Sequence, residues 1–287
     1  MNLSFEILSE HICTWKLGER LLARYQARPE VPPTESPRPV LHPVFTLGGV
    51  PVTDFRPADH PWHHGIAWAF TYINGDTFWG GPTYRRATAA YEWMENHGQQ
   101  IHRAWTKLPP PACGIVQEVE WRAAAGRPLL REIRTISASL AATGWALHFH
   151  SHFDNISGTE LVCTSPVGEG RTEGGYFGLM WRGHPSWAHG KVFLAEGETD
   201  SAMGRHAAWL AYERPRTADS APAVLIFRDD ARNPRHPTAW FERHANQPLV
   251  TFAFAYREPW RISAGENFEL RHEIIVRDGT WGEITKD

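Results

Sequence analysis

Histidines gather in a short segment whose residue types suit acid–base chemistry or metal binding. The segment Asp59–Gly65 reads D-H-P-W-H-H-G and places one carboxylate and three imidazoles within six positions. A proline and a final glycine restrict its backbone, and the apolar run Ile66–Ile73 follows directly. Polar clusters at the entrance of a strand are typical of functional sites on rigid scaffolds. The alternative is a loop whose imidazoles only cap backbone groups.

A second group of histidines alternates along a predicted strand. His148, His150 and His152 share one face of Trp145–Asp154, whereas the other face is apolar and includes Phe149. Neighbours on one face lie about 7 Å apart, too far for all three imidazoles to bind one ion at about 2 Å without a bend. Two of these histidines could bind a metal with a residue from elsewhere. A solvated sheet face is the other interpretation.

Two further segments combine ionisable side chains with glycine or proline. Gly168–Arg182 holds Arg171 and Glu173 between glycines, and it is either a site or a glycine-rich hairpin. Its glycine spacing is not G-x-G-x-x-G, which excludes a dinucleotide site. The second segment, Asn233–Phe241, contains two prolines and ends in Trp240-Phe241. Its amide, imidazole and indole groups suit hydrogen bonds to hydroxyl groups and stacking on a sugar ring.

The elements that must position these segments are predicted to be strands. Seventeen short alternating or apolar runs, bounded by Gly, Pro, Asn or Asp, recur along the chain, and few windows show helical spacing. This pattern predicts an all-β protein, a large two-sheet antiparallel β-sandwich formed by a single domain over residues 1–287. The proline-rich piece Arg28–Pro39 is predicted to be an extended surface connection.

Composition excludes several classes of partner. The formal net charge is −3 and Lys and Arg form no run longer than a pair, so nucleic acid is not an expected partner. No apolar stretch approaches the 18 or so residues of a membrane helix, and no membrane partner is expected. Three widely spaced cysteines supply neither a disulfide framework nor a thiolate zinc site. We therefore expect a cytoplasmic protein.

Five segments resemble a bacterial family labelled PmoA-like after a methane-oxygenase annotation. They are R-P-V-L-H-P at Arg38–Pro43, D-H-P-W-H-H-G at Asp59–Gly65, N-G-D-T-F-W at Asn74–Trp79, G-G-Y-F-G-L-M-W-R at Gly174–Arg182 and N-P-R-H-P-T-A-W-F at Asn233–Phe241. The methane label does not suit a chain without a spanning segment. The resemblance implies a galactose-mutarotase-like β-supersandwich and a role in sugar catabolism. It assigns no catalytic role to any residue of this chain.

The leading hypothesis is a carbohydrate-active enzyme, an epimerase, lyase or hydrolase, that uses His and Glu for acid–base chemistry. His64 and His150 are predicted to act as acid or base, Glu173 as a base and Arg182 as an anion or oxyanion clamp. The predicted substrate-binding residues are Asp59, His60, Trp79, Arg171, Asn233, His236 and Trp240. We expect the four segments described above to converge on one sugar-sized pocket. No cofactor is required by this hypothesis.

Two other functions remain open. The first is an oxidoreductase that depends on a divalent transition metal, with ligands drawn from His60, His63, His64, His148 and His150. The second is a noncatalytic sugar-binding module. The identity of the sugar and the oligomeric state are not predicted.

Overall fold

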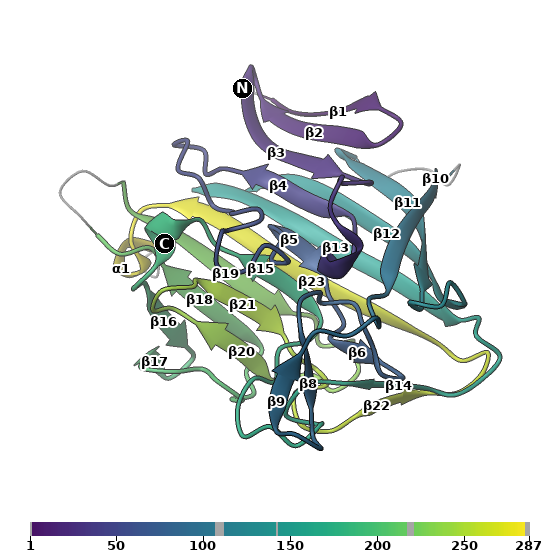
Figure 1. Ribbon diagram of the computed structural model, residues 1–287. Coiled ribbons are helices and arrows are strands. Elements are labelled where there is room, and N and C mark those ends of the chain that lie inside the picture. Colours follow the sequence, from purple (N-terminus) through teal and green to yellow (C-terminus); the bar gives the residue numbers. More distant parts are fainter. Residues whose placement is uncertain (1, 107–111, 142, 217–220, 285–287) are drawn as a thin grey trace.

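Long strands with alternating side chains form the larger of two main sheets in the computed structural model (Figure 1). The structure describes residues 2–106, 112–141, 143–216 and 221–284. Nine antiparallel strands follow the order β10-β11-β12-β13-β23-β19-β18-β16-β17. Their bounds are Gln99–Trp105 (β10), Gly114–Arg122 (β11), Pro128–Ala141 (β12), Gly144–Asn155 (β13), Lys191–Leu194 (β16), Gly197–Thr199 (β17), Trp209–Glu213 (β18), Ala223–Asp229 (β19) and Asn267–Asp278 (β23).

The second main sheet has eight strands in the order β1-β2-β3-β4-β5-β15-β21-β20. Their bounds are Leu3–Ser9 (β1), Ile12–Leu17 (β2), Arg20–Gln26 (β3), Val40–Val44 (β4), Ile66–Trp68 (β5), Leu179–Arg182 (β15), Trp240–Arg243 (β20) and Leu249–Phe252 (β21). This sheet joins strands from both ends of the chain, because β15 pairs with both β5 and β21. Residues far apart in the sequence therefore meet on its surface.

Smaller elements complete the described chain. A four-stranded sheet contains β6 (Tyr72–Ile73), β7 (Asp76–Thr77), β14 (Leu161–Thr164) and β22 (Trp260–Ile262), and β8 (Thr83–Arg85) pairs with β9 (Ala90–Glu92). The helical turns are η1 (Pro33–Glu35), η2 (Pro185–Trp187) and α1 (Trp281–Ile284). Strand accounts for 51% of the protein and helix for 3%, which confirms the predicted all-β sandwich. Within the described ranges, no helix has the length and apolar character needed to cross a membrane.

The two main sheets pack face to face around a core that is rich in tryptophan. Most of the fully buried indoles donate their N–H to a backbone carbonyl, such as Trp181 to Val52 and Trp240 to Ala207, at 3.0 Å in both cases. Such a partner compensates a buried indole N–H for its lost hydration. The fully buried indoles are those of Trp15, Trp68, Trp121, Trp145, Trp181, Trp187 and Trp240. Much of the tryptophan content is therefore structural.

The faces of β13 follow the alternation expected from the sequence. Phe149 is buried with 4% exposure, and Leu147 and Phe153 are completely buried. The side chains of His148 and His150 are instead 40% and 42% exposed. The prediction that the imidazoles lie opposite the core is confirmed.

This arrangement predicts different costs for two substitutions on β13. Phe149→Ala should lower the free energy of unfolding by about 3–5 kcal/mol, because it removes a large buried ring and leaves a cavity. His150→Ala should cost less than about 1 kcal/mol, because its side chain is on the surface. Urea unfolding of both variants at pH 7.5 measures the difference. Equal losses would contradict the assigned faces.

Candidate functional site

The segment Asp59–Gly65 folds against the end of β15. The Gly65 N–H donates to Asp54 O at 2.8 Å, and the Arg182 N–H donates to Gly65 O at 2.7 Å. Gly65 has a φ of +34°, and a Cβ at this position would collide with the backbone of β4. A glycine is therefore required for the segment to pass this close to the sheet.

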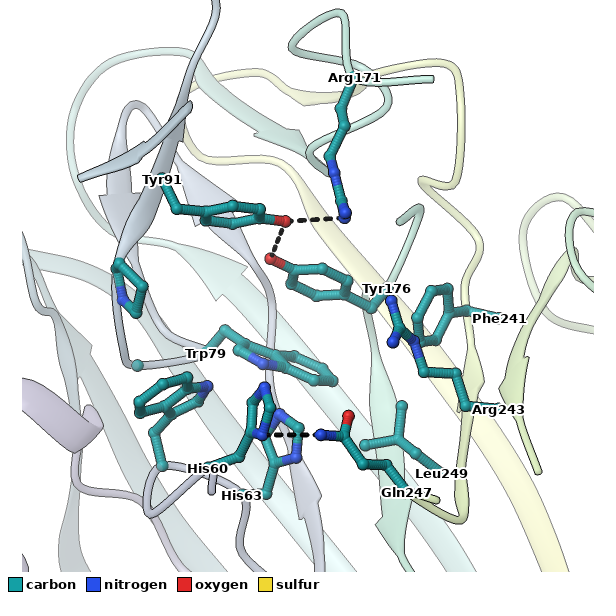
Figure 2. A pocket seen from close by; sticks show the side chains of 13 residues that line it. His60, His63, Trp79, Tyr91, Arg171, Tyr176, Phe241, Arg243, Gln247 and Leu249 are labelled. Atoms are coloured by element: carbon teal, nitrogen blue, oxygen red, sulfur yellow. Dashed lines mark hydrogen bonds between the residues drawn. The ribbon is translucent and has the colours of Figure 1, made fainter. Parts of the chain in front are cut away.

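A cavity of about 380 Å³ opens above this segment (Figure 2). Aromatic rings form much of its wall. The lining residues are His60, Trp62, His63, Trp79, Gly80, Pro82, Tyr91, Arg171, Tyr176, Phe241, Arg243, Gln247 and Leu249. Three of the predicted substrate-binding residues, His60, Trp79 and Arg171, are thus brought together, and they come from three separate segments.

His60 is oriented by a carboxylate. Its Nδ1 lies 2.9 Å from Asp59 Oδ2, and Gln247 Nε2 donates to the same oxygen at 2.6 Å and also lies 2.9 Å from Nδ1. Burial disfavours the charged form of Asp59, but the hydrogen bonds from His60 and Gln247 outweigh it and lower the pKa of this carboxyl. An ionised Asp59 accepts a hydrogen bond from Nδ1–H of His60, so Nε2 of His60 keeps a free lone pair.

His63 has the opposite tautomer. Arg182 Nη1 lies 3.5 Å from His63 Nδ1, and since a guanidinium only donates, Nδ1 must accept and Nε2 must carry the proton. Burial, together with the nearby Arg182 charge, lowers the pKa of His63 well below its usual value. The rings of His60 and His63 stack with their centroids 4.8 Å apart. The base of the cavity therefore combines an imidazole that accepts a proton with a neutral imidazole that donates a hydrogen bond.

The aromatic wall is held by a buried cation and by two glycines. Arg38 donates to the backbone carbonyls of Trp62 and Trp79 at 2.7 and 3.1 Å. Gly80 and Gly81 have φ values of +89° and +73°, and a Cβ on either would collide with Trp62. The glycines after Trp79 thus allow the two tryptophan segments to approach each other.

Two tyrosine hydroxyl groups face the other side of the cavity. Tyr91 OH lies 3.1 Å from Tyr176 OH and accepts a hydrogen bond of 2.9 Å from Arg171 Nη1, as Figure 2 shows. Burial raises the pKa of Tyr176 well above its usual value, so this phenol stays protonated. Its ring packs on Trp79 at a centroid distance of 4.5 Å. The hydroxyl pair supplies polar groups directly above an aromatic surface.

Comparison with protein families shows which family the chain belongs to. Residues 13–285 match DUF6807, a family of unknown function. The chain belongs to this family. A comparison with curated proteins returned no match. The resemblance to PmoA-like proteins stays a prediction.

Solved structures similar to this DUF6807 member include three carbohydrate enzymes. A GH36 alpha-galactosidase from Geobacillus stearothermophilus has a TM-score of 0.45 and 10% identity, over 98% of this chain and 41% of that one. An alpha-galactosidase from Lactobacillus brevis has a TM-score of 0.38 and 11% identity, over 96% and 39%. A polysaccharide lyase has a TM-score of 0.37 and 11% identity, over 89% and 32%. The chain spans less than half the length of these proteins.

His64 does not line the cavity, in contrast to our expectation. Its side chain is fully buried, and Nε2 lies 3.0 Å from Glu35 Oε2 and 3.1 Å from Pro61 O. Burial and the nearby Arg38 charge lower the pKa of His64 to about 4. Adjacent residues in a tight segment point in different directions, and here His63 faces the cavity while His64 faces the protein interior. His64 therefore positions the loop.

Arg182 and Glu173 also differ from their predicted places. The Arg182 side chain is 4% exposed and lies behind His63, with Nη2 3.8 Å from Asp59 Oδ1. Glu173 is exposed on its glycine-rich turn and does not line the cavity, although Arg171, two residues earlier, does. Arg182 can act on a ligand only through His63 and Asp59.

The histidine row lines a different depression. His148 and His150 border a cavity of about 570 Å³ on the outer face of the nine-stranded sheet, and none of its lining residues belongs to the first cavity. Their imidazoles lie 3.4 Å from Glu273 Oε1 and 3.3 Å from Glu269 Oε2. The prediction that all four segments converge on one pocket is wrong, because β13 is a strand of the opposite sheet.

Hydrogen bonds to Asp229, the last residue of β19, fix the segment Asn233–Phe241. Asn233 donates to Asp229 Oδ1 at 2.7 Å, and His236 Nδ1 lies 2.8 Å from Asp229 Oδ2. His236 borders a third cavity, which is also separate from the first. The fully buried Trp240 has no ring face for a sugar, so its assignment as a stacking residue is corrected. Its neighbour Phe241 points the opposite way and lines the first cavity.

The five histidines considered as metal ligands lie in two places: His60, His63 and His64 in the segment before β5, and His148 and His150 on β13. Within the residues that the structure describes, no three or more His, Cys, Asp or Glu side chains form a group that could hold a metal ion. The metal-dependent alternative stays a prediction.

Several cavity residues were not predicted from the sequence. Trp62 and Tyr176 lie inside motifs that we singled out, and strand alternation next to a buried Trp240 could have indicated Phe241. Tyr91 and Gln247 carry no sequence signal, because they reach the cavity only through the fold.

Proposed function

We propose that the protein is a carbohydrate-active enzyme that binds a sugar in the 380 Å³ cavity and transfers a proton through His60. The observation that carries this proposal is the placement of an Asp59-oriented imidazole beside an aromatic wall. Aromatic faces bind the apolar face of a sugar ring, and polar groups around them bind its hydroxyl groups. Volumes of this order are typical of small-molecule sites.

Stacking is assigned to Trp62, whose ring is partly exposed at the cavity. Gln247 and the Tyr91 hydroxyl can form hydrogen bonds with sugar hydroxyl groups on either side of such a ring. Trp79 is 3% exposed and supports the wall from behind.

The two stacked imidazoles, of His60 and His63, are assigned different roles in the reaction. Nε2 of His60 accepts a proton from the substrate, and Asp59 stabilises the imidazolium that forms. Nε2–H of His63 donates a hydrogen bond to the oxygen where negative charge develops. Epimerisation, elimination and hydrolysis all need such a proton acceptor, so the reaction class stays open among these three.

The binding step can be tested without knowing the reaction. Titration of a panel of monosaccharides by calorimetry should identify at least one that binds, and Trp62→Ala should weaken its affinity about 5- to 30-fold, from the loss of about 1–2 kcal/mol of stacking. Trp209→Ala, a partly exposed tryptophan on the nine-stranded sheet, is the matched control and should leave affinity unchanged. The proposal fails if no sugar in the panel binds.

Turnover separates an enzyme from a binding module. Each sugar that binds is incubated with stoichiometric protein and followed by NMR. New resonances would support an epimerase, lyase or hydrolase. Binding without conversion would support the noncatalytic module.

A further inference from the structure

We propose that the sugar bound in the cavity carries a negatively charged group, a carboxylate or a phosphate, which Arg171 and Arg243 hold. This inference rests on the proposed function and names its substrate class. It is motivated by two guanidinium groups that reach the same cavity from different elements without a carboxylate partner (Figure 2).

Arg171 is fixed in place by its surroundings. Its only side-chain hydrogen bond to the described residues goes to Tyr91 OH, and its Cζ lies 5.0 Å from the centroid of the Tyr91 ring. Gly174, with a φ of +101°, leaves the space that the guanidinium occupies, because a Cβ there would collide with Nη1. A neutral phenol satisfies one donor and leaves the charge uncompensated.

Arg243 ends β20 and lies over Phe241, with its Cζ 5.6 Å from the ring centroid. Across the described parts of the chain, its side chain forms no hydrogen bond or ion pair. The aromatic surface directs the guanidinium toward the cavity without neutralising it.

Two arginines outside the cavity are paired with carboxylates. Arg228 donates to Glu273 at 3.0 Å, and Arg261 donates to Glu160 at 2.6 Å. By contrast, no Asp or Glu is among the residues that line the first cavity. Asp59, which contacts His60 at its base, is already engaged by His60 and Gln247.

The electrostatic balance of the cavity therefore favours an anion. Two guanidinium groups line it, and the buried Arg182 lies behind His63, with its closest carboxylate contact at 3.8 Å. Guanidinium groups bind carboxylate and phosphate oxygens with paired, charge-assisted hydrogen bonds. The aromatic wall would bind the ring while the arginines bind its charged substituent.

The test compares matched pairs of sugars by calorimetry at constant ionic strength. Glucose and galactose are each titrated beside their uronic acids and their 6-phosphates. At least one charged sugar should bind about ten-fold or more tightly than its neutral counterpart. A preference for the uronic acid identifies a carboxylate, and a preference for the 6-phosphate identifies a phosphate.

Variants then assign the preference to the two arginines. Arg171→Gln and Arg243→Gln should each reduce the ratio of charged to neutral affinity about ten-fold. Arg261→Gln, an exposed arginine outside the cavity, should leave the ratio unchanged, and melting temperatures establish that all variants fold.

The outcomes separate this inference from the proposed function. If neutral sugars bind as tightly as charged ones, or if the arginine variants do not change the ratio, the inference is wrong and the sugar site stands. If no sugar binds, both are wrong.

Discussion

His60→Ala and Asp59→Asn should each lower kcat about 10²–10⁴-fold on the sugar that the enzyme converts, the usual effect of losing a general base. His60→Ala removes the proton acceptor itself. Asp59→Asn keeps the shape of the side chain, but its amide no longer fixes the proton on Nδ1. Because the Asp59 side chain is half exposed and that of His60 is 32% exposed, the melting temperature should change by only a few degrees. Initial rates at saturating substrate measure the effect.

A second histidine–aspartate pair on the surface provides the control. His152 Nε2 lies 3.1 Å from Asp154 Oδ1, and both side chains have exposures similar to that of His60. His152→Ala and Asp154→Asn should leave kcat unchanged. If the control pair reduced kcat as much as His60→Ala, the assignment of the dyad would be wrong.

Lowering the pH from 7 to 5 should reduce the free energy of unfolding by more than about 3 kcal/mol. Burial lowers the pKa of His42, His63, His64 and His272 in the folded protein. Below a pH of about 6.5 the unfolded chain binds protons that the folded protein excludes. The stability is therefore complete above that pH and decreases below it, by up to about 1.4 kcal/mol per pH unit for each such histidine.

Urea unfolding at several pH values between 5 and 7.5 measures this slope. His42→Gln should reduce the slope by about one histidine's share, because it removes one titrating imidazole. Nδ1 of His42 bonds to Thr53 Oγ1 at 3.0 Å, a contact that glutamine can replace. His148→Gln, with a surface side chain, is the control. A stability that is constant or increases toward pH 5 would contradict the prediction.

The histidines of this chain differ in burial, and the candidate site and the core use different kinds. His64 and His272 are buried, and burial lowers their pKa values and favours the neutral imidazole. His60 keeps a partly exposed ring and an ionised partner, as proton transfer requires. The short segment Asp59–Gly65 contains both kinds, and they differ only in which side of the loop each ring faces.

The sequence alone determined the features that follow from local periodicity and backbone restriction. Alternation over Trp145–Asp154 predicted the two faces of β13, because side chains on a strand point to opposite sides. The residue types of the D-H-P-W-H-H-G segment predict a candidate site, and three of its residues line the first cavity. His60, Trp79 and Arg171 were assigned to the binding of substrate, and all three line one cavity.

Only the tertiary structure decided which polar segments share a cavity and which side chains reach it. The His148–His152 row lies on the opposite sheet, and strand order is set by pairings such as β15 with β5 and β21, which no local pattern reports. Trp240 and Phe241 are both buried, yet only Phe241 lines the cavity, because alternate side chains of β20 face opposite sides and the tertiary structure decides which side the cavity occupies. The ionisable groups of the Asp59–Gly65 segment are thus local in the sequence, but the other residues of the candidate site reach it only through contacts between distant strands.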